Sequence, residues 1–159
     1  MIPVRLKLSG FLSYWDESDL NLEQVDLACI SGSNGAGKSS LLDAITWALF
    51  GEARRRDDAI INSHCDTAEV TLDFDYEGHR YRILRSKTRG KSARLDFFIL
   101  DEESAWRPLT EATMSKTQDR IIQTLRLDYE TFINASFFLQ GKDDQFAQKT
   151  PGNRKKILS

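Results

Sequence analysis

A glycine-rich stretch between an apolar segment and an amphipathic segment constrains this sequence more than any other feature. Residues 32–39 read Gly-Ser-Asn-Gly-Ala-Gly-Lys-Ser and match the pattern G-x-x-x-x-G-K-[ST] in full. The apolar run Val25–Ser31 precedes the motif and predicts a buried strand. Apolar residues at helical spacing follow it over Ser39–Phe50, and Gly51 stands where a C-terminal glycine is expected. A strand, a glycine-rich loop and a helix in this order predict a phosphate-binding loop, or P-loop.

The predicted loop suits a nucleoside triphosphate and Mg²⁺ because of its backbone and side-chain chemistry. Glycines let consecutive N–H groups point inward around an anion, and the following helix start adds partial positive charge. The residues expected to bind the nucleotide here are Ser33, Asn34, Gly35, Ala36, Gly37, Lys38, Ser39 and Ser40. Lys38 should reach the β- and γ-phosphates, the Ser39 hydroxyl should ligate Mg²⁺, and Ser40 should bond the α-phosphate side. The alternative is a chance glycine-rich turn between a strand and a helix.

Alternating apolar residues predict a series of strands elsewhere in the chain. Val4–Leu8 alternates with basic residues, and Ser13–Asn21 is polar and reads as a loop. Glu69–Tyr76 and His79–Arg85 alternate on either side of Glu77-Gly78, which predicts a β-hairpin. A third strand is expected at Leu95–Leu100, and Trp106 begins a short return strand.

Helices are expected in the last third of the sequence. Ser115–Leu125 carries an apolar stripe at helical spacing, and Asp128 is the expected N-cap of a short helix that ends at Ala135. The apolar run Ser136–Leu139 follows and ends at Gln140-Gly141. Thr150-Pro151 predicts the start of a further helix that continues to the end of the sequence.

Several of these segments together resemble the SbcC family of SMC-like DNA-repair ATPases. Leu6–Ser13 resembles the first strand of that family, although many relatives have arginine where this chain has Leu12. Asn34–Gly51 is similar to the family's P-loop and the helix that follows. The other segments that carry the resemblance are Tyr81–Ile83 with Arg85, Phe132–Ala135, Phe138–Gly141, and Thr150-Pro151 with Arg154-Lys155.

The resemblance implies an α/β fold, the P-loop NTPase of an ABC-type ATPase head, with only its N-terminal lobe in this chain. Residues 1–149 would form that lobe, and residues 150–159 would begin a truncated coiled-coil helix. A C-terminal lobe would supply the signature motif and the Walker B acid. Two heads would enclose two ATP molecules as a homodimer, and the expected partners are the metal-dependent nuclease subunit SbcD and double-stranded DNA.

The resemblance also implies roles for three residues outside the glycine-rich motif. Gln140 would lie in the Q-loop, where its amide oxygen could ligate Mg²⁺ and orient the attacking water. Lys38 and Gln140 are therefore the expected catalytic residues, and an ordinary surface glutamine is the alternative for Gln140. Ser13 would lie near the nucleotide, as would the backbone of the segment Ile60–Ser63, which includes Asn62.

One other segment imitates a catalytic motif, and another suggests a contact with DNA. The run Phe97–Leu100 followed by Asp101-Glu102 resembles a Walker B strand, but its place after a hairpin favours an antiparallel strand that ends in a turn. Five cations occur in ten residues, namely Arg85, Lys87, Arg89, Lys91 and Arg94. They could contact DNA phosphates or form a solvated hairpin loop, and both interpretations stay open.

Composition limits the remaining classes. The 159 residues suit one domain, and a net charge of −2 means that any nucleic-acid contact needs a local basic patch. Cys29 and Cys65 lack the spacing of a metal site or a disulfide framework, and His64 and His79 have no spaced partner. No segment reaches the ~18 apolar residues of a membrane span, so we expect a cytoplasmic protein without membrane contact.

Two other functions fit parts of the pattern. A chromosome-organising SMC protein would share the head but lack the nuclease partner. A small P-loop kinase would suit the length, but kinases of that type alternate strands and helices, and the hairpin strands between Glu69 and Trp106 argue against it.

Overall fold

The computed structural model describes residues 1–23 and 36–140, with side chains described at residues 1–23 and 41–134. The predicted strand Val25–Ser31 and residues Ser33–Gly35 lie outside the described residues. The same is true of the helix expected from Thr150-Pro151 and of the boundary proposed between residues 149 and 150.

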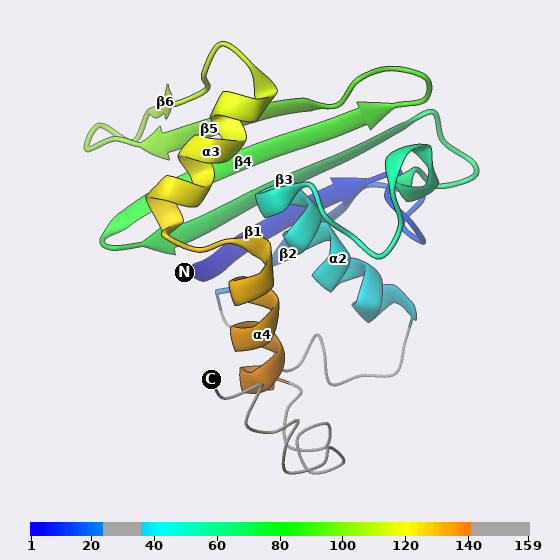
Figure 1. The fold of residues 1–159 in the computed structure, drawn as a ribbon, viewed down its shortest axis with the longest axis horizontal. Helices are drawn as coiled ribbons and strands as arrows, with labels where there is room; N and C mark the ends of the chain where they lie inside the picture. The colour runs from blue at the N-terminus through cyan, green and yellow to red at the C-terminus, as the bar shows by residue number, and fades with distance from the viewer. Residues whose placement is uncertain (24–35, 141–159) are drawn as a thin grey trace.

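Six strands form one antiparallel sheet in the order β2-β1-β3-β4-β5-β6 (Figure 1). The strands are β1 Ile2–Ser9, β2 Ser18–Asn21, β3 Thr67–Tyr76, β4 His79–Thr88, β5 Arg94–Leu100 and β6 Trp106–Pro108. The predicted hairpin is confirmed, because β3 and β4 pair from Thr67 with Thr88 to Tyr76 with His79. Glu77 and Gly78 make its turn with φ values of 50° and 81°, which suit the twist of a two-residue hairpin turn.

Strand β2 lies in a segment that was predicted to be a loop, and that part of the prediction is wrong. Ser18–Asn21 pairs with β1 at the edge of the sheet, where Asp19 forms an ion pair with Arg5. Just before the strand, Glu17 lies 3.1 Å from the Nζ atom of Lys7. An edge strand needs only one neighbour and buries little surface, so a polar segment can form one without an alternating apolar pattern.

Within the described residues, three α-helices and one short 3₁₀ helix accompany the sheet. They are α2 Ala36–Phe50, η1 Asp57–Ile60, α3 Met114–Leu125 and α4 Tyr129–Gln140. The predicted cap of α4 is confirmed, because the Oδ1 atom of Asp128 accepts from Thr131 N at 2.8 Å, and Thr113 caps α3 by accepting from Lys116 N at 3.1 Å. Helix α4 continues beyond Ala135 to Gln140, so the expected break there is wrong. A short apolar run does not reveal by periodicity whether it is helical.

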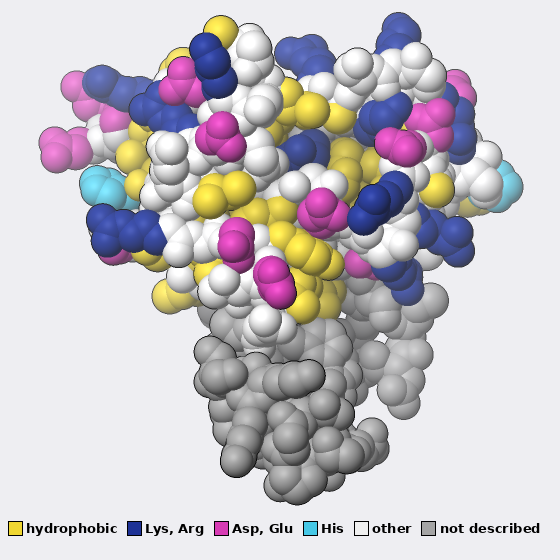
Figure 2. Space-filling model, in the orientation of Figure 1, with side chains coloured by type: hydrophobic (Ala, Val, Ile, Leu, Met, Phe, Trp, Pro, Cys, Tyr) yellow, Lys and Arg dark blue, Asp and Glu magenta, His cyan; other side chains and the backbone are white. Residues whose placement is uncertain are grey.

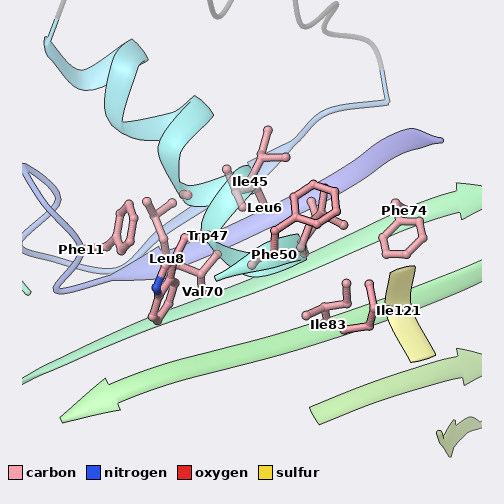
Figure 3. Close-up of a cluster of buried hydrophobic side chains, with 14 of the residues drawn as sticks. Leu6, Leu8, Phe11, Ile45, Trp47, Phe50, Val70, Phe74, Ile83 and Ile121 are labelled. Carbon is pink, nitrogen blue, oxygen red and sulfur yellow. The ribbon is translucent and has the colours of Figure 1, made fainter. Parts of the chain in front are cut away.

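The core lies between the sheet and the helices. Helix α2 packs against β3 and β4, and α3 packs against β5, on the face turned to the viewer in Figure 1. Leu6 and Leu8 from β1, Val70 from β3 and Ile45 from α2 meet in this layer (Figure 3). Phe74, Tyr81 and Phe97 continue it across three strands, with ring centroids 5.4 Å and 5.6 Å apart.

The opposite face of the sheet is polar and pairs its charges. Arg82 bonds Asp73 at 2.7 Å and 2.8 Å and lies 4.2 Å from the centroid of the Trp106 ring. Arg80 bonds Asp75 through Nε at 2.8 Å. Arg80, Arg82, Asp73 and Trp106 are among the residues that line an open hollow of about 530 Å³. Antiparallel sheets commonly bury one face and leave the other to solvent, as this one does.

The face of the molecule that carries the helices has both a hydrophobic area and a charged area (Figure 2). Figure 2 shows hydrophobic side chains gathered in its lower middle, with Lys, Arg, Asp and Glu around its upper rim. Within the described part of the chain, no helix combines the length and apolar character that a membrane crossing requires.

Candidate nucleotide-binding site

The glycine-rich motif leads directly into helix α2. The helix begins at Ala36, so Gly37, Lys38, Ser39 and Ser40 lie in its first turns. The start of a helix leaves N–H groups without an intrahelical partner, and these favour an anion. The first turn of α2 contains no acidic residue that would compete for them. The backbone described here therefore fits a phosphate group, and the side chains of residues 36–40 lie outside the description.

Helix α2 is fixed against the sheet by a continuous apolar face. Ala44, Ile45, Ala48 and Leu49 are fully buried. Trp47 is also buried and places its ring 5.3 Å from that of Phe11, which follows β1. The packing connects the helix to the segment that contains Ser13.

Ser13 lies in a tight turn after β1. Phe11 N donates to Tyr14 O at 3.0 Å and Tyr14 N donates to Phe11 O at 2.8 Å, which leaves Ser13 exposed between them. Gly10 precedes the turn with φ of 62°, and a Cβ atom there would lie 2.1 Å from Thr67 O. Only glycine fits that position, so the start of the turn is sterically determined.

Asn62 holds this turn in place. Its Nδ2 donates to Leu12 O at 2.6 Å, and its backbone N–H donates to Gly10 O at 2.8 Å. Its Oδ1 accepts from His64 N at 2.9 Å. The structure thus brings Asn62 and the Ser13 turn together, and the Asn62 amide is already bonded within the protein. Leu12, where many relatives have arginine, has φ of 49° and packs against the core.

Gln140 is the last residue of α4, and its side chain lies outside the described residues. Helix α4 packs against the C-terminal end of α2: the Phe50 ring lies 5.7 Å from Phe132 and 6.0 Å from Tyr129. The helix that carries Gln140 and the helix that follows the glycine-rich motif are therefore in direct contact.

Asp101-Glu102 forms a turn, as its place in the sequence favoured. The Oδ1 atom of Asp101 accepts from the backbone N–H groups of Glu103 and Ala105, both at 2.9 Å, and Arg107 Nε lies 2.7 Å from Oδ2. The Ala105 N–H and Arg107 hold the pKa of Asp101 below its usual range. Strand β5 is antiparallel to β4 and β6, which differs from the geometry of a Walker B strand.

The five cations counted as one basic loop have different environments. Arg85 is buried in β4, with 4% of its surface exposed. Lys87 Nζ bonds Asp58 at 2.8 Å, and Arg89 bonds the backbone oxygens of Cys65 and Asn62, each at 3.0 Å. Lys91 and Arg94 are exposed, and Arg94 lies 3.9 Å from the carboxylate of Asp96. A contact of Arg85 with DNA in this fold is excluded by its burial.

Three polar contacts of α2 were not predicted from the sequence. Asp43 lies mostly buried one turn after Ser39, and burial raises its pKa while Arg54 opposes the shift. Arg54 Nε is 2.7 Å from Asp43 Oδ2 without hydrogen-bond geometry, so this contact is electrostatic. At the far end of the helix, Arg85 and Gln118 bond its last carbonyl groups. The only sequence signal for these contacts is Gly51, which marks where the helix ends.

The described residues contain no cluster of three histidine, cysteine or acidic side chains able to hold a metal ion.

The AAA domain family matches this chain over residues 5–159. The chain belongs to the AAA domain family. That membership and the antiparallel sheet beside α2 confirm the predicted α/β class.

Two relatives that match nearly the whole chain agree with the family resemblance seen in the sequence. SbcC, a subunit of the nuclease SbcCD, from Deinococcus radiodurans is 33% identical over 99% of this chain. The DNA double-strand break repair Rad50 ATPase of Thermoplasma volcanium is 38% identical over 99% of this chain. The chain spans 18% and 17% of the lengths of these two relatives. The resemblance to SbcC is confirmed.

A solved structure, the SMC head domain from Thermotoga maritima, aligns with 76% of this chain and 42% of that chain. Its TM-score is 0.47 at 20% identity.

Proposed function

We propose that residues 32–39 bind the triphosphate of ATP with Mg²⁺, and that the chain acts as the N-terminal lobe of an ATPase head in DNA double-strand-break repair. The observation that carries the proposal is the start of α2 within the motif, at Ala36, with no acidic residue in its first turn. Family membership supports the P-loop assignment. The named relatives support the repair context.

Each predicted residue has a defined part in the proposed site. Backbone N–H groups of residues 33–37 would surround the phosphates, and the Lys38 ammonium would contact the β- and γ-phosphates. Ser39 and Gln140 would hold Mg²⁺, which when bound neutralises phosphate charge during transfer to water. Gln140 would orient that water. Ser40 would contact the α-phosphate, and the Ser13 turn with Asn62 would lie beside the nucleotide.

The relatives' names support the proposal of a larger assembly. Asp101 and Glu102 belong to a hairpin turn, which favours a general base from outside the β5–β6 segment. We propose that a C-terminal lobe supplies the Walker B acid and the signature motif, with residues 1–149 as this lobe and 150–159 leading into a coiled coil. Two such heads would dimerise on ATP and control a nuclease subunit of the SbcD type on double-stranded DNA.

Nucleotide binding is tested by a matched pair of lysine substitutions. Lys38 is the third residue of α2, and Lys116 is the third residue of α3 and exposed. Lys38→Ala should weaken MgATP binding at least about tenfold, because a charge-assisted contact to phosphate is lost. Lys116→Ala should leave binding unchanged. Isothermal titration of both variants decides the question, and equal affinities would refute the P-loop assignment.

Trp15 offers an optical readout near the proposed site. It is 59% exposed, lies two residues after Ser13, and stacks on His64 with centroids 4.7 Å apart. MgATP should change its fluorescence, and Trp15→Phe should remove most of that change while Trp47 and Trp106 remain. A full nucleotide-dependent signal in Trp15→Phe would place the nucleotide away from the Ser13 turn.

Hydrolysis is tested by adding the proposed C-terminal lobe. This chain alone should turn over ATP weakly or not at all, and a C-terminal lobe from the same head should restore turnover and ATP-dependent dimerisation. The contrary result is steady turnover by this chain alone that Glu102→Ala abolishes, which would make the β5 turn a true Walker B site.

A further inference from the structure

Three residues from separate elements close the C-terminal end of α2, opposite the proposed phosphate site. Gly51 follows the helix, Arg85 comes from β4 and Gln118 comes from α3. We refer to them as the α2 C-terminal network. The network is distant in sequence from the glycine-rich motif and has no part in the proposed contacts to ATP.

The network bonds the carbonyl groups that a helix end leaves free. Gly51 N donates to Trp47 O at 2.7 Å. Arg85 Nε donates to Ala48 O at 3.3 Å, and Gln118 Nε2 donates to Leu49 O at 2.7 Å. Arg85 also donates to Gln118 Oε1. Three successive carbonyl groups thus have named donors, two of which come from β4 and α3, so the end of α2 is attached to both of these elements.

Arg85 is a buried cation whose compensation comes from the helix. No ion pair within the described residues includes it, and burial lowers its pKa to about 10. A buried charge is costly unless hydrogen bonds and opposite partial charges offset the loss of water. The last turn of α2 contains no basic residue, so Arg85 supplies the cation that complements the negative end of the helix dipole.

The Arg85 guanidinium occupies the space where a side chain at position 51 would lie. Gly51 has φ of 72°, and a Cβ atom at that position would lie 2.9 Å from Arg85 Nη1. The space beside the helix end is therefore filled by the guanidinium, and the geometry leaves little room for the helix end to shift.

We propose that Arg85 and Gln118 are positioning residues for nucleotide binding, which hold the C-terminal end of α2 and thereby set where its phosphate-binding start lies. The inference rests on the proposed function of the glycine-rich motif. A helix is stiff, and one of 15 residues is about 22 Å long, so a tilt of about 5° at one end displaces the other by about 2 Å. Because α4 packs on Phe50, the same end also locates the helix that carries Gln140.

The test compares affinity with stability in variants of the whole chain. Arg85→Met keeps an apolar stem but removes the guanidinium, and should raise the Kd for MgATP about tenfold at a temperature where the protein is fully folded. Ile121→Val, a fully buried change on α3, should lower the melting temperature without changing the Kd. Arg85→Lys, which keeps the charge but only one donor site, should give an intermediate Kd.

Gln118→Met extends the test if Arg85→Met does not fold, because Gln118 is only partly buried. Its loss should raise the Kd about threefold. Wild-type Kd values in folded Arg85→Met and Gln118→Met proteins, with only their melting temperatures lowered, would overturn the inference. Lys38→Ala separates the two proposals: if it leaves MgATP binding intact, the proposed function fails, whereas if it weakens binding while the network variants do not, only the positioning role fails.

Discussion

Strand β4 has one arginine on each face, Arg82 and Arg85, and the two side chains have different bonding partners. Arg82 points to the solvent-facing side, where Asp73 bonds it with two hydrogen bonds and the Trp106 ring lies beneath it. Arg85, three residues later, points into the core and bonds a helix carbonyl and the Gln118 amide. One guanidinium is neutralised by a neighbouring carboxylate, and the other by the end of a helix.

This difference shows what each face contributes. The exposed pairs on the outer face, such as Arg80 with Asp75, add little stability because water screens their charges. On the inner face every group fits among close neighbours, and a polar group persists there only if its bonds are made. Stability should therefore depend steeply on the inner face and weakly on the outer face.

The largest expected effect tests that contrast with two adjacent phenylalanines on β5. Phe97 is fully buried beside Tyr81, whereas Phe98 is partly exposed on the other face. Phe97→Ala should lower the free energy of unfolding by about 3–5 kcal/mol because it leaves a cavity. Phe98→Ala should cost clearly less. Urea denaturation followed by circular dichroism measures the unfolding free energy of both variants. Equal losses would contradict the expected difference between the two faces of the sheet.

A second effect isolates the crowding around Arg85. Gly51 and Gly90 both have φ of 72°, but a Cβ atom at Gly90 would have nothing within 4 Å. Alanine at Gly90 should cost about 1 kcal/mol for its backbone conformation, and alanine at Gly51 should cost more because it meets the guanidinium. Adding Arg85→Met to Gly51→Ala should recover part of the difference. Purely additive losses would show that the guanidinium does not determine the space at Gly51.

The third effect concerns a pair on the outer face. Arg80 bonds Asp75 and also reaches Glu23 at 3.3 Å, and both partners are substantially exposed. Arg80→Met should change the free energy of unfolding by at most about 1 kcal/mol, and by less at high salt. Thermal unfolding at two salt concentrations tests this, and a large salt-independent loss would contradict it.

The smallest effect lies at the β5–β6 turn and depends on pH. Because the folded protein lowers the pKa of Asp101, the unfolded chain takes up this proton at a higher pH than the folded chain does. Its contribution is complete above the usual carboxyl pKa of about 4 and is lost as the pH falls through the folded value. Asp101→Asn should therefore flatten the acid limb of a stability-versus-pH curve. An unchanged acid limb would argue against this bonded carboxylate.

Local sequence patterns predicted those helices and strands whose structure depends on residues close by in sequence. Alternation gave β3, β4 and β5, and the Glu77-Gly78 signal gave the turn between the first two. Strand β2 was missed because its strand character comes from pairing with β1. Helix α4 was predicted too short because the apolar run after Ala135 carries no helical periodicity.

The sequence predicts a phosphate-binding motif at the start of α2, but it gives no sign of the contacts that Arg85 makes at the end of that helix. The motif specifies the helix start because glycines and a lysine at fixed spacing have a defined chemistry. Arg85 looked like one member of a basic cluster, because its bond to Gln118, 33 positions away in sequence, leaves no local pattern. Asn62 likewise gave no sign that its amide bonds Leu12 O.

The two edge strands of the sheet, β2 and β6, are poorly suited to pairing with a strand from another chain. Strand β2 has four residues and is polar, and strand β6 has three and ends in Pro108, which lacks an N–H to offer another chain. Neighbouring copies therefore find no long, regular ladder to extend, which protects a six-stranded antiparallel sheet from fibrillar aggregation.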